Sequence, residues 1–432
     1  MKTKMIRAAI AAVAAGAAIP MAANAASSIT IDSVQQRWPW NNKVDITYTV
    51  KGGQVTPAGE YCGLRFHVAT ASGATYDFEG YSVGASAESG VSDEGLQHTV
   101  TWIAPSGIKL IDCTMTATLF TTNVPSGNDY MIIDLEDGEV YYEGLMRTQE
   151  ESNDRYNTGN TYKTAKMVLR KVAKTSESAF PSGYPVGHDD FKVTHTNSNK
   201  DWTNPATNWI VKTDYYVGIH LVSQAQYTKL GLTNPSKYKS DCRPVETVSW
   251  NDVRDSKKSS EDVAPNATGG FLARLNNLTK TQSGIMGFDL PTELMWEIAA
   301  RAGRTTSYWW GADTWETATA AQYITYGGNS GSHPCDVGAR LPNAWGLYDV
   351  SGNLWEYTRD TANGPANLAD ASDPFTPTSV DNPTKLNTRG GSHWQSSTTT
   401  LPSWRVSNRG LQGLDTTAAS AYYGFRVAYI VK

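Results

Sequence analysis

The distribution of tryptophan is the feature of this sequence that most limits its fold. Eleven of the 14 tryptophans lie after residue 200, in a stretch that is otherwise rich in Gly, Ser and Asn. Large aromatic side chains bury much apolar surface without needing long helices or strands around them. We therefore expect this half of the chain to form a compact α+β domain with little regular secondary structure, held together by tryptophan packing.

Helix signals in this half are few and short. They fall at residues 223–231, with Ser223 placed as an N-cap, and at 248–253, 271–280 and 292–303. The last is the strongest, because Thr292 is a good N-cap, Glu297 and Arg301 pair one turn apart, and Gly303 ends the helix. Glu293 shares a face with Glu297, and a capped surface helix explains both carboxylates better than catalysis does.

The first half has the pattern of β-strands. Apolar and polar residues alternate in the segments 44–50, 64–70, 98–104 and 113–120, and turn-forming clusters separate them. Such short alternating segments are typical of an antiparallel sandwich. We expect an immunoglobulin-like all-β domain at residues 26–145, a polar linker at 146–162 and the second domain at 163–432.

Residues 1–25 have the form of a bacterial secretory signal peptide. A basic start and an Ala-rich apolar run precede Ala23-Asn24-Ala25, which matches the small-residue cleavage rule. No other stretch approaches the roughly 18 apolar residues of a membrane span. The mature chain is therefore expected to be secreted, periplasmic or on the cell surface, with no integral membrane segment. Its net charge of -5 indicates no nucleic-acid partner.

Export makes disulfides possible. The four cysteines allow three pairings, and the simplest keeps each disulfide in its own half, as Cys62–Cys113 and Cys242–Cys335. No two cysteines lie within a few residues of each other, which argues against a thiolate metal site.

One turn carries a pattern of potential metal ligands. Asp349, Asn353 and Glu356 follow one another at spacings of four and three, with Gly352 between them. Closely spaced oxygens suit Ca²⁺, which takes six to eight of them. The alternative is a polar turn before a strand. No histidine-rich motif or phosphate-binding loop occurs.

Six blocks of the second half, taken in order, resemble the formylglycine-generating enzyme family, also called the sulfatase-modifying factor domain. They are DYYVGIHLVSQAQY, RPVETVSWNDV, LPTELMWEIAARAG, PNAWGLYDVSGNLWEY, RGGS and GFRVAY. The resemblance runs from about residue 162 to 432 and implies a C-type-lectin-like α+β fold. It also implies a calcium site at the turn described above, formed by side chains of Asp349 and Glu356 and by the carbonyls of Gly352 and Leu354.

The resemblance argues against the family's oxidase chemistry in this chain. The family's oxidases convert a cysteine of a sulfatase into formylglycine and use two copper-binding cysteines just after the Gly-Gly-Ser motif. Gln395 stands at the first of these positions, and no cysteine follows Cys335. Thiolates are the ligands that Cu(I) prefers, so we assign no catalytic residue.

We therefore expect a calcium-stabilised binding or interaction module, with the sandwich as a spacer or attachment domain. Aromatic and arginine side chains are the usual anchors of recognition surfaces. The expected ligand-binding residues, two of which resemble the lining of the family's active site, are Trp355, Ser392, Trp394, Gln395, Trp404, Arg405, Tyr422 and Tyr423. Core packing is the alternative for Trp394, Trp404 and Arg405. The ligand would be an exported protein, a peptide or a glycan. The alternative function is a family oxidoreductase that modifies an exported protein or peptide.

Overall fold

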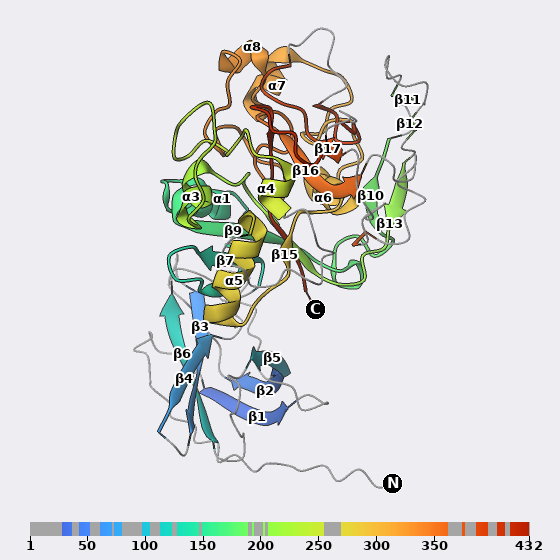
Figure 1. The fold of residues 1–432 in the computed structure, drawn as a ribbon. Helices are drawn as coiled ribbons and strands as arrows, with labels where there is room; N and C mark the ends of the chain where they lie inside the picture. Colours follow the sequence, from blue (N-terminus) through green and yellow to red (C-terminus); the bar gives the residue numbers. More distant parts are fainter. Residues whose placement is uncertain are drawn as a thin grey trace, which may run out of the picture. The chain divides into compact units, whose positions relative to one another are not determined.

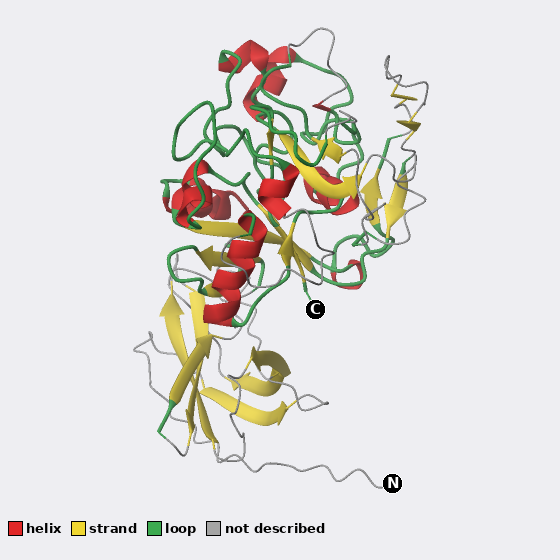
Figure 2. Cartoon of the chain, in the orientation of Figure 1, coloured by secondary structure: helices red, strands yellow, loops and turns green. Residues whose placement is uncertain are grey.

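The computed structural model describes residues 28–36, 43–51, 61–70, 73–79, 97–103, 113–122, 128–146, 149–188, 192–193, 202–203, 206–254, 269–361, 374–375, 386–395, 404–410 and 415–431. The chain divides into two compact units, one of Met1–Asp129 with Tyr142–Arg147, the other of Tyr130–Tyr141 with Thr148–Lys432 (Figures 1 and 2). The expected signal peptide lies outside the described residues. Within these ranges, no helix is long and apolar enough to cross a membrane.

The first unit contains two three-stranded antiparallel sheets. One has the order β1 (Ser28–Gln36), β2 (Lys43–Lys51), β5 (Gln97–Ile103). The other has the order β4 (Thr75–Glu79), β3 (Tyr61–Thr70), β6 (Cys113–Thr122). Side chains of both sheets share one apolar core, which includes Ile46, Phe66, Trp102 and Met115. The alternating pattern thus correctly predicted a two-sheet arrangement.

The register of β3 and β6 contradicts the predicted Cys62–Cys113 disulfide. Cys62 lies opposite Thr121, whereas Cys113 lies opposite Thr70, at the other end of the strand pair. Eight strand positions, from 62 to 70, span about 27 Å at roughly 3.4 Å per residue. A disulfide needs Cα atoms within about 7 Å. The register therefore rules out the first predicted disulfide, and Cys242 and Cys335 carry free thiols, so the second is absent too. Sequence separation alone does not reveal strand register.

The second unit is built on a six-stranded sheet. Its order is β15 (Phe288–Asp289), β19 (Ala428–Ile430), β14 (Tyr215–Gly218), β9 (Lys166–Val172), β7 (Tyr130–Asp134), β8 (Val140–Glu143). Strand β7 falls inside the range 26–145 that we expected to belong to the sandwich. Helices α1 (Gln149–Asn157) and α2 (Thr161–Thr164) occupy the expected linker. The second unit therefore begins earlier than residue 163.

The four expected helices are all present. They are α3 (Gln224–Lys229), α4 (Trp250–Arg254), α5 (Phe271–Ser283) and α6 (Glu293–Arg301). The Ser223 hydroxyl accepts from the Gln226 amide at 3.1 Å, and the Thr292 hydroxyl accepts from the Met295 amide at 3.1 Å. These contacts confirm both N-caps. The sequence did not predict α7 (Thr317–Tyr323), α8 (Gly327–Ser330) or the 3-10 helix Thr175–Glu177.

The remaining strands form small sheets. The sheet β17 (Leu386–Arg389), β16 (Trp355–Thr361), β18 (Tyr423–Gly424) joins three of the blocks quoted above. Two hairpin-like pairs are β10 (Tyr184–Val186) with β13 (Thr207–Trp209), and β11 (Lys192–Val193) with β12 (Trp202–Thr203). Trp296, Trp309 and Trp404 are among the largest fully buried side chains. Tryptophan packing therefore does hold this loop-rich unit together.

Candidate functional site

The loop after β17 is rigidly built. Gly390 and Gly391 both have positive φ, of 92° and 77°. A Cβ atom on Gly391 would lie 2.7 Å from the Trp404 ring and 2.9 Å from Oε1 of Gln395. These two positions therefore require glycine, both for backbone conformation and for space. The loop rests directly on the buried Trp404.

Gln395 closes this loop. Its side-chain Oε1 accepts a hydrogen bond from the Ser392 amide at 2.8 Å, and its carbonyl accepts from the Gly327 amide at 3.0 Å. The side chain at the first copper position of the resemblance is thus a neutral amide that is already engaged in the loop. It offers no thiolate to a soft metal such as Cu(I).

The exposed side of the loop carries an aromatic group that we call the Trp394 surface, formed by Tyr238, His333, His393, Trp394 and Tyr422. The Trp394 side chain is 59% exposed, and its ring centroid lies 5.6 Å from that of Tyr422. His393 lies 5.7 Å from Tyr422 and 6.2 Å from Tyr238, which in turn lies 6.0 Å from His333. The surface therefore joins residues from four separate segments of the chain.

His393 is the buried member of this group. Its Nδ1 lies 2.8 Å from the Asn353 carbonyl, whereas its Nε2 is buried and has no hydrogen-bond partner among the described residues. Burial lowers the pKa of His393 to about 4, and the neighbouring His333 and Lys237 add to this, although the bond to Asn353 opposes it. The ring is therefore neutral at neutral pH.

The eight expected ligand-binding residues divide into exposed and buried ones. Trp394, Gln395, Arg405 and Tyr422 are at least partly exposed. The other four are buried: Trp355, Ser392, Trp404 and Tyr423. Trp404 stacks on Trp315 with centroids 5.0 Å apart, and Tyr423 stacks on Tyr357 at 5.7 Å. The three aromatic residues among these four belong to the core, and the buried Ser392 is not available to a ligand on the surface.

Sequence reasoning missed three members of the surface. Tyr238 and His333 lie far from the C-terminal stretch in the chain, and no local pattern marks them. His393 lies next to the expected Ser392, but its contact with Asn353, 40 residues away in the chain, is not visible in the local sequence.

The expected calcium turn has one feature that favours a cation. Oδ2 of Asp349 accepts from the Gly338 amide at 2.8 Å, but Oδ1 is buried and has no hydrogen-bond partner among the described residues. Burial raises the pKa of this carboxyl group. Asp349 and Asn353 both have positive φ, of 54° and 59°, so the turn is tightly folded. A cation would satisfy the free oxygen.

The second expected carboxylate ligand is already paired. Both oxygens of Glu356 accept from Arg426, at 2.6 Å from Nε and 2.7 Å from Nη2. Arg426 also donates to the carbonyls of Gly218 and Tyr348. In the described part of the chain, no three His, Cys, Asp or Glu side chains come together as a metal-binding group. Asp349 therefore fits calcium better than Glu356 does, and calcium binding stays a prediction.

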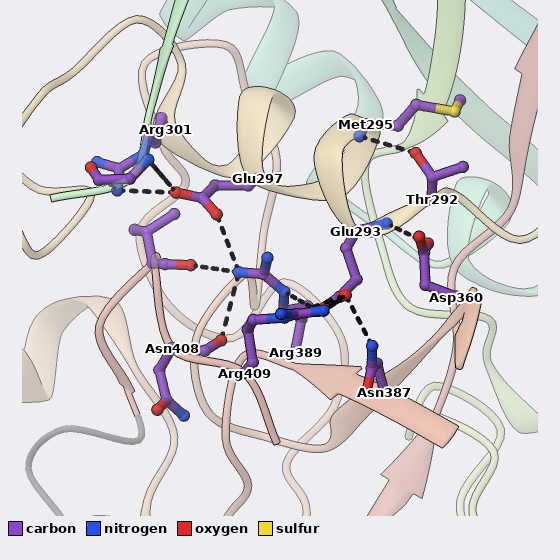
Figure 3. Close-up of polar contacts among 12 residues, drawn as sticks. Thr292, Glu293, Met295, Glu297, Arg301, Asp360, Asn387, Arg389, Asn408 and Arg409 are labelled. Atoms are coloured by element: carbon purple, nitrogen blue, oxygen red, sulfur yellow. Dashed lines mark hydrogen bonds and ion pairs between the residues drawn. The ribbon is translucent and has the colours of Figure 1, made fainter. Parts of the chain in front are cut away.

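Glu293 and Glu297 are not on a surface helix, contrary to our expectation. Both are fully buried, and Figure 3 shows them pointing from α6 toward Arg389. Arg389 donates to Glu293 through Nε at 2.9 Å and to Glu297 through Nη1 at 3.0 Å. Arg409 also donates to Glu293, at 2.9 Å, and Arg301 to Glu297, at 2.9 Å. This buried network ties α6 to β17 and to residues 404–410, which is a structural role.

Comparison with known proteins shows the family of the second half of the chain. Residues 180–430, more than half of the chain, match the family model of the sulfatase-modifying factor enzyme 1-like domain. The chain belongs to this family. The resemblance inferred from the six sequence blocks and the α+β fold are thus confirmed.

Individual relatives are distant. The chaperone protein LppX of Paenibacillus barcinonensis is 26% identical over 175 residues, which cover 34% of this chain and 62% of that protein. The formylglycine-generating enzyme of Mycobacterium tuberculosis is 31% identical over 163 residues, which cover 32% of this chain and 50% of that protein. The chain thus spans between half and about three fifths of the length of these relatives.

Two solved structures match part of this chain. Treponema denticola variable protein 1 matches with a TM-score of 0.46 and 21% identity, over 61% of this chain and 95% of that one. PvdO from Pseudomonas aeruginosa matches with a TM-score of 0.45 and 18% identity, over 61% and 94%.

Proposed function

We propose that this protein is an exported binding module of the sulfatase-modifying factor family, without copper-dependent formylglycine formation. One observation carries the proposal: at the first copper position stands Gln395, whose amide closes the loop, and directly beside it Trp394 is 59% exposed. Export rests on the sequence of the first 25 residues. We include calcium, bound through Asp349, as a structural ligand.

The Trp394 surface has the properties of a recognition site. An indole that is mostly exposed leaves apolar area in water, which a bound partner would remove. Tryptophan and tyrosine are enriched among the residues that dominate binding energy. The loop under Trp394 is fixed by the bonds of Gln395 and by the His393 amide, which donates to the Asn353 carbonyl at 2.8 Å. A rigid loop loses little entropy when a ligand binds.

The binding function is tested with immobilised peptides and glycans, offered to the full chain. The expected result is a ligand that the wild type and Ile210→Ala bind alike and that Trp394→Ala binds at least tenfold more weakly. Ile210 is a matched control because it is also exposed, at 49%. Equal binding by all three proteins, or no ligand at all, would show that this surface does not bind.

The enzyme alternative has its own test. The purified protein is incubated with Cu(I) and O₂ and with a cysteine-containing sulfatase peptide, and the peptide mass is followed. We expect the cysteine to remain, because Gln395 offers no thiolate and the chain has no cysteine beyond position 335. Formation of the aldehyde would overturn the proposal.

A further inference from the structure

We propose that the ligand of the Trp394 surface is a neutral sugar, one of whose hydroxyl groups donates a hydrogen bond to Nε2 of His393. This inference rests on the binding function proposed above and specifies its ligand class. It combines a buried acceptor that has no partner with the exposed aromatic rings around it.

The tautomer of His393 follows from its surroundings. A carbonyl oxygen only accepts hydrogen bonds, so the 2.8 Å contact with the Asn353 carbonyl requires the proton to be on Nδ1. In a neutral imidazole the other nitrogen then carries a lone pair. Nε2 is therefore a fixed hydrogen-bond acceptor, and the Nδ1 bond holds its direction.

A fixed acceptor selects the chemistry of its partner. Nε2 is buried and has no partner among the described residues. Leaving such an atom unsatisfied costs about 1–3 kcal/mol. A carboxylate or a phosphate dianion has only acceptors and cannot satisfy it. The ligand must bring an O–H or N–H group.

The charges around the surface favour an uncharged ligand. Lys237 and Lys239 are exposed in the loop of Tyr238, but Asp241 of the same loop is exposed too. The exposed carboxylate of Asp336 accepts a hydrogen bond from the Ser240 hydroxyl at 3.3 Å. Because these exposed formal charges balance, they select neither a cation nor an anion, and a neutral hydroxyl suits the surface better.

The shape of the surface favours a ring with one apolar face. Trp394 and Tyr422 offer aromatic faces whose planes differ by 41°. Aromatic faces attract polarised C–H groups through their negative quadrupole. A pyranose has C–H groups on its face and hydroxyls on its rim, so it contacts the rings and Nε2 together. Because Nε2 is buried, the proposal requires side chains of the Trp394 surface to move when the sugar binds.

Two variants of His393 distinguish the role of Nε2 from that of Nδ1. In His393→Asn the side-chain amide keeps an N–H group near the position of Nδ1, so the bond to the Asn353 carbonyl remains while Nε2 is removed. In His393→Gln the amide extends to the position of Nε2 and restores a polar atom there. Unfolding midpoints of both variants are compared with the wild type, so that loss of folding is recognised.

The full chain and its variants are applied to an array of neutral, acidic and amino glycans and to a peptide array. We expect neutral glycans to bind, His393→Asn to weaken binding about tenfold, His393→Gln to recover part of it, and Trp394→Ala to abolish it. If His393→Asn, folded, binds glycans as the wild type does, the acceptor is not used.

Three other outcomes would decide between the sugar assignment and the binding function itself. If only peptides bind, with Trp394→Ala inactive, the sugar assignment is wrong while the binding function stands. If neither array yields a ligand that depends on Trp394, both fail. A preference for acidic or amino glycans over neutral ones would contradict the charge argument.

Discussion

Replacing Glu293 by glutamine should destabilise the second unit by an amount that depends on pH. Burial alone would raise the pKa of Glu293, but the guanidinium groups of Arg409 and Arg389 outweigh it and lower the pKa from 4.5 to about 2. The folded state therefore holds the carboxylate more strongly in its charged form than the unfolded chain does. One pKa unit corresponds to about 1.4 kcal/mol, so this difference contributes about 3 kcal/mol at pH 7.

The stabilisation is present above the unfolded pKa, near 4.5, and is lost as the pH falls toward the folded pKa, near 2. Between pH 7 and pH 3 about 2 kcal/mol of it should disappear, because at pH 3 the unfolded chain binds a proton that the folded state does not. Glu293→Gln cannot titrate, so the stability difference between it and the wild type should shrink by that amount.

The assay is denaturant unfolding of the full chain at pH 7, 5 and 3, followed by tryptophan fluorescence. Eleven of the 14 tryptophans lie after residue 200, so the signal reports mainly on the second unit. Glu136→Gln is the control, since Glu136 is 74% exposed and its change should cost no more than about 0.5 kcal/mol. A stability difference for Glu293→Gln that is the same at pH 7 and pH 3 would refute the electrostatic account.

Three further predictions follow from the same contacts. Calcium should bind weakly, with a Kd of about 10⁻⁴–10⁻³ M, because Arg426 already neutralises Glu356. Calorimetry should show a heat of calcium binding for the wild type and none for Asp349→Asn, and submicromolar affinity would contradict this prediction. Alkylation after unfolding without reductant should label Cys242 and Cys335, whose thiols are free; detection of a Cys62–Cys113 crosslink by mass spectrometry would contradict the strand register. In chemical unfolding, Trp404→Ala should lower the free energy of unfolding by about 3–5 kcal/mol and Trp394→Ala by less than about 0.5 kcal/mol, since of the two only Trp404 is buried. Equal losses of stability in the two variants would contradict this difference in burial.

Local features of the sequence predicted local features of the structure. The caps at Ser223 and Thr292 were readable because a cap bonds to an amide only three residues away. The alternation in residues 44–50 predicted β2 because every second side chain of a strand faces the core. In both cases the physical cause lies within one element.

Contacts between residues far apart in the chain could not be predicted from the sequence. The arginines that hold Glu293 lie 96 and 116 residues further along the chain, so the sequence near α6 indicated a surface helix. Trp394 and Trp404 are the same residue type ten positions apart, and only packing against distant segments makes one exposed and the other buried. Burial depends on partners that no local pattern identifies.

Strand β7 has a practical consequence for dividing this protein into fragments. Its residues Met131 and Ile133 are fully buried, and Tyr130–Asp134 pairs along the whole of Lys166–Arg170. A fragment that starts at residue 163 would leave that edge of β9 unpaired and its apolar face in water, and such edges recruit other chains into aggregates. A well-behaved fragment has to start before Tyr130 and carry the chain through residues 142–147, whereas a cut chosen from family boundaries alone should give insoluble material.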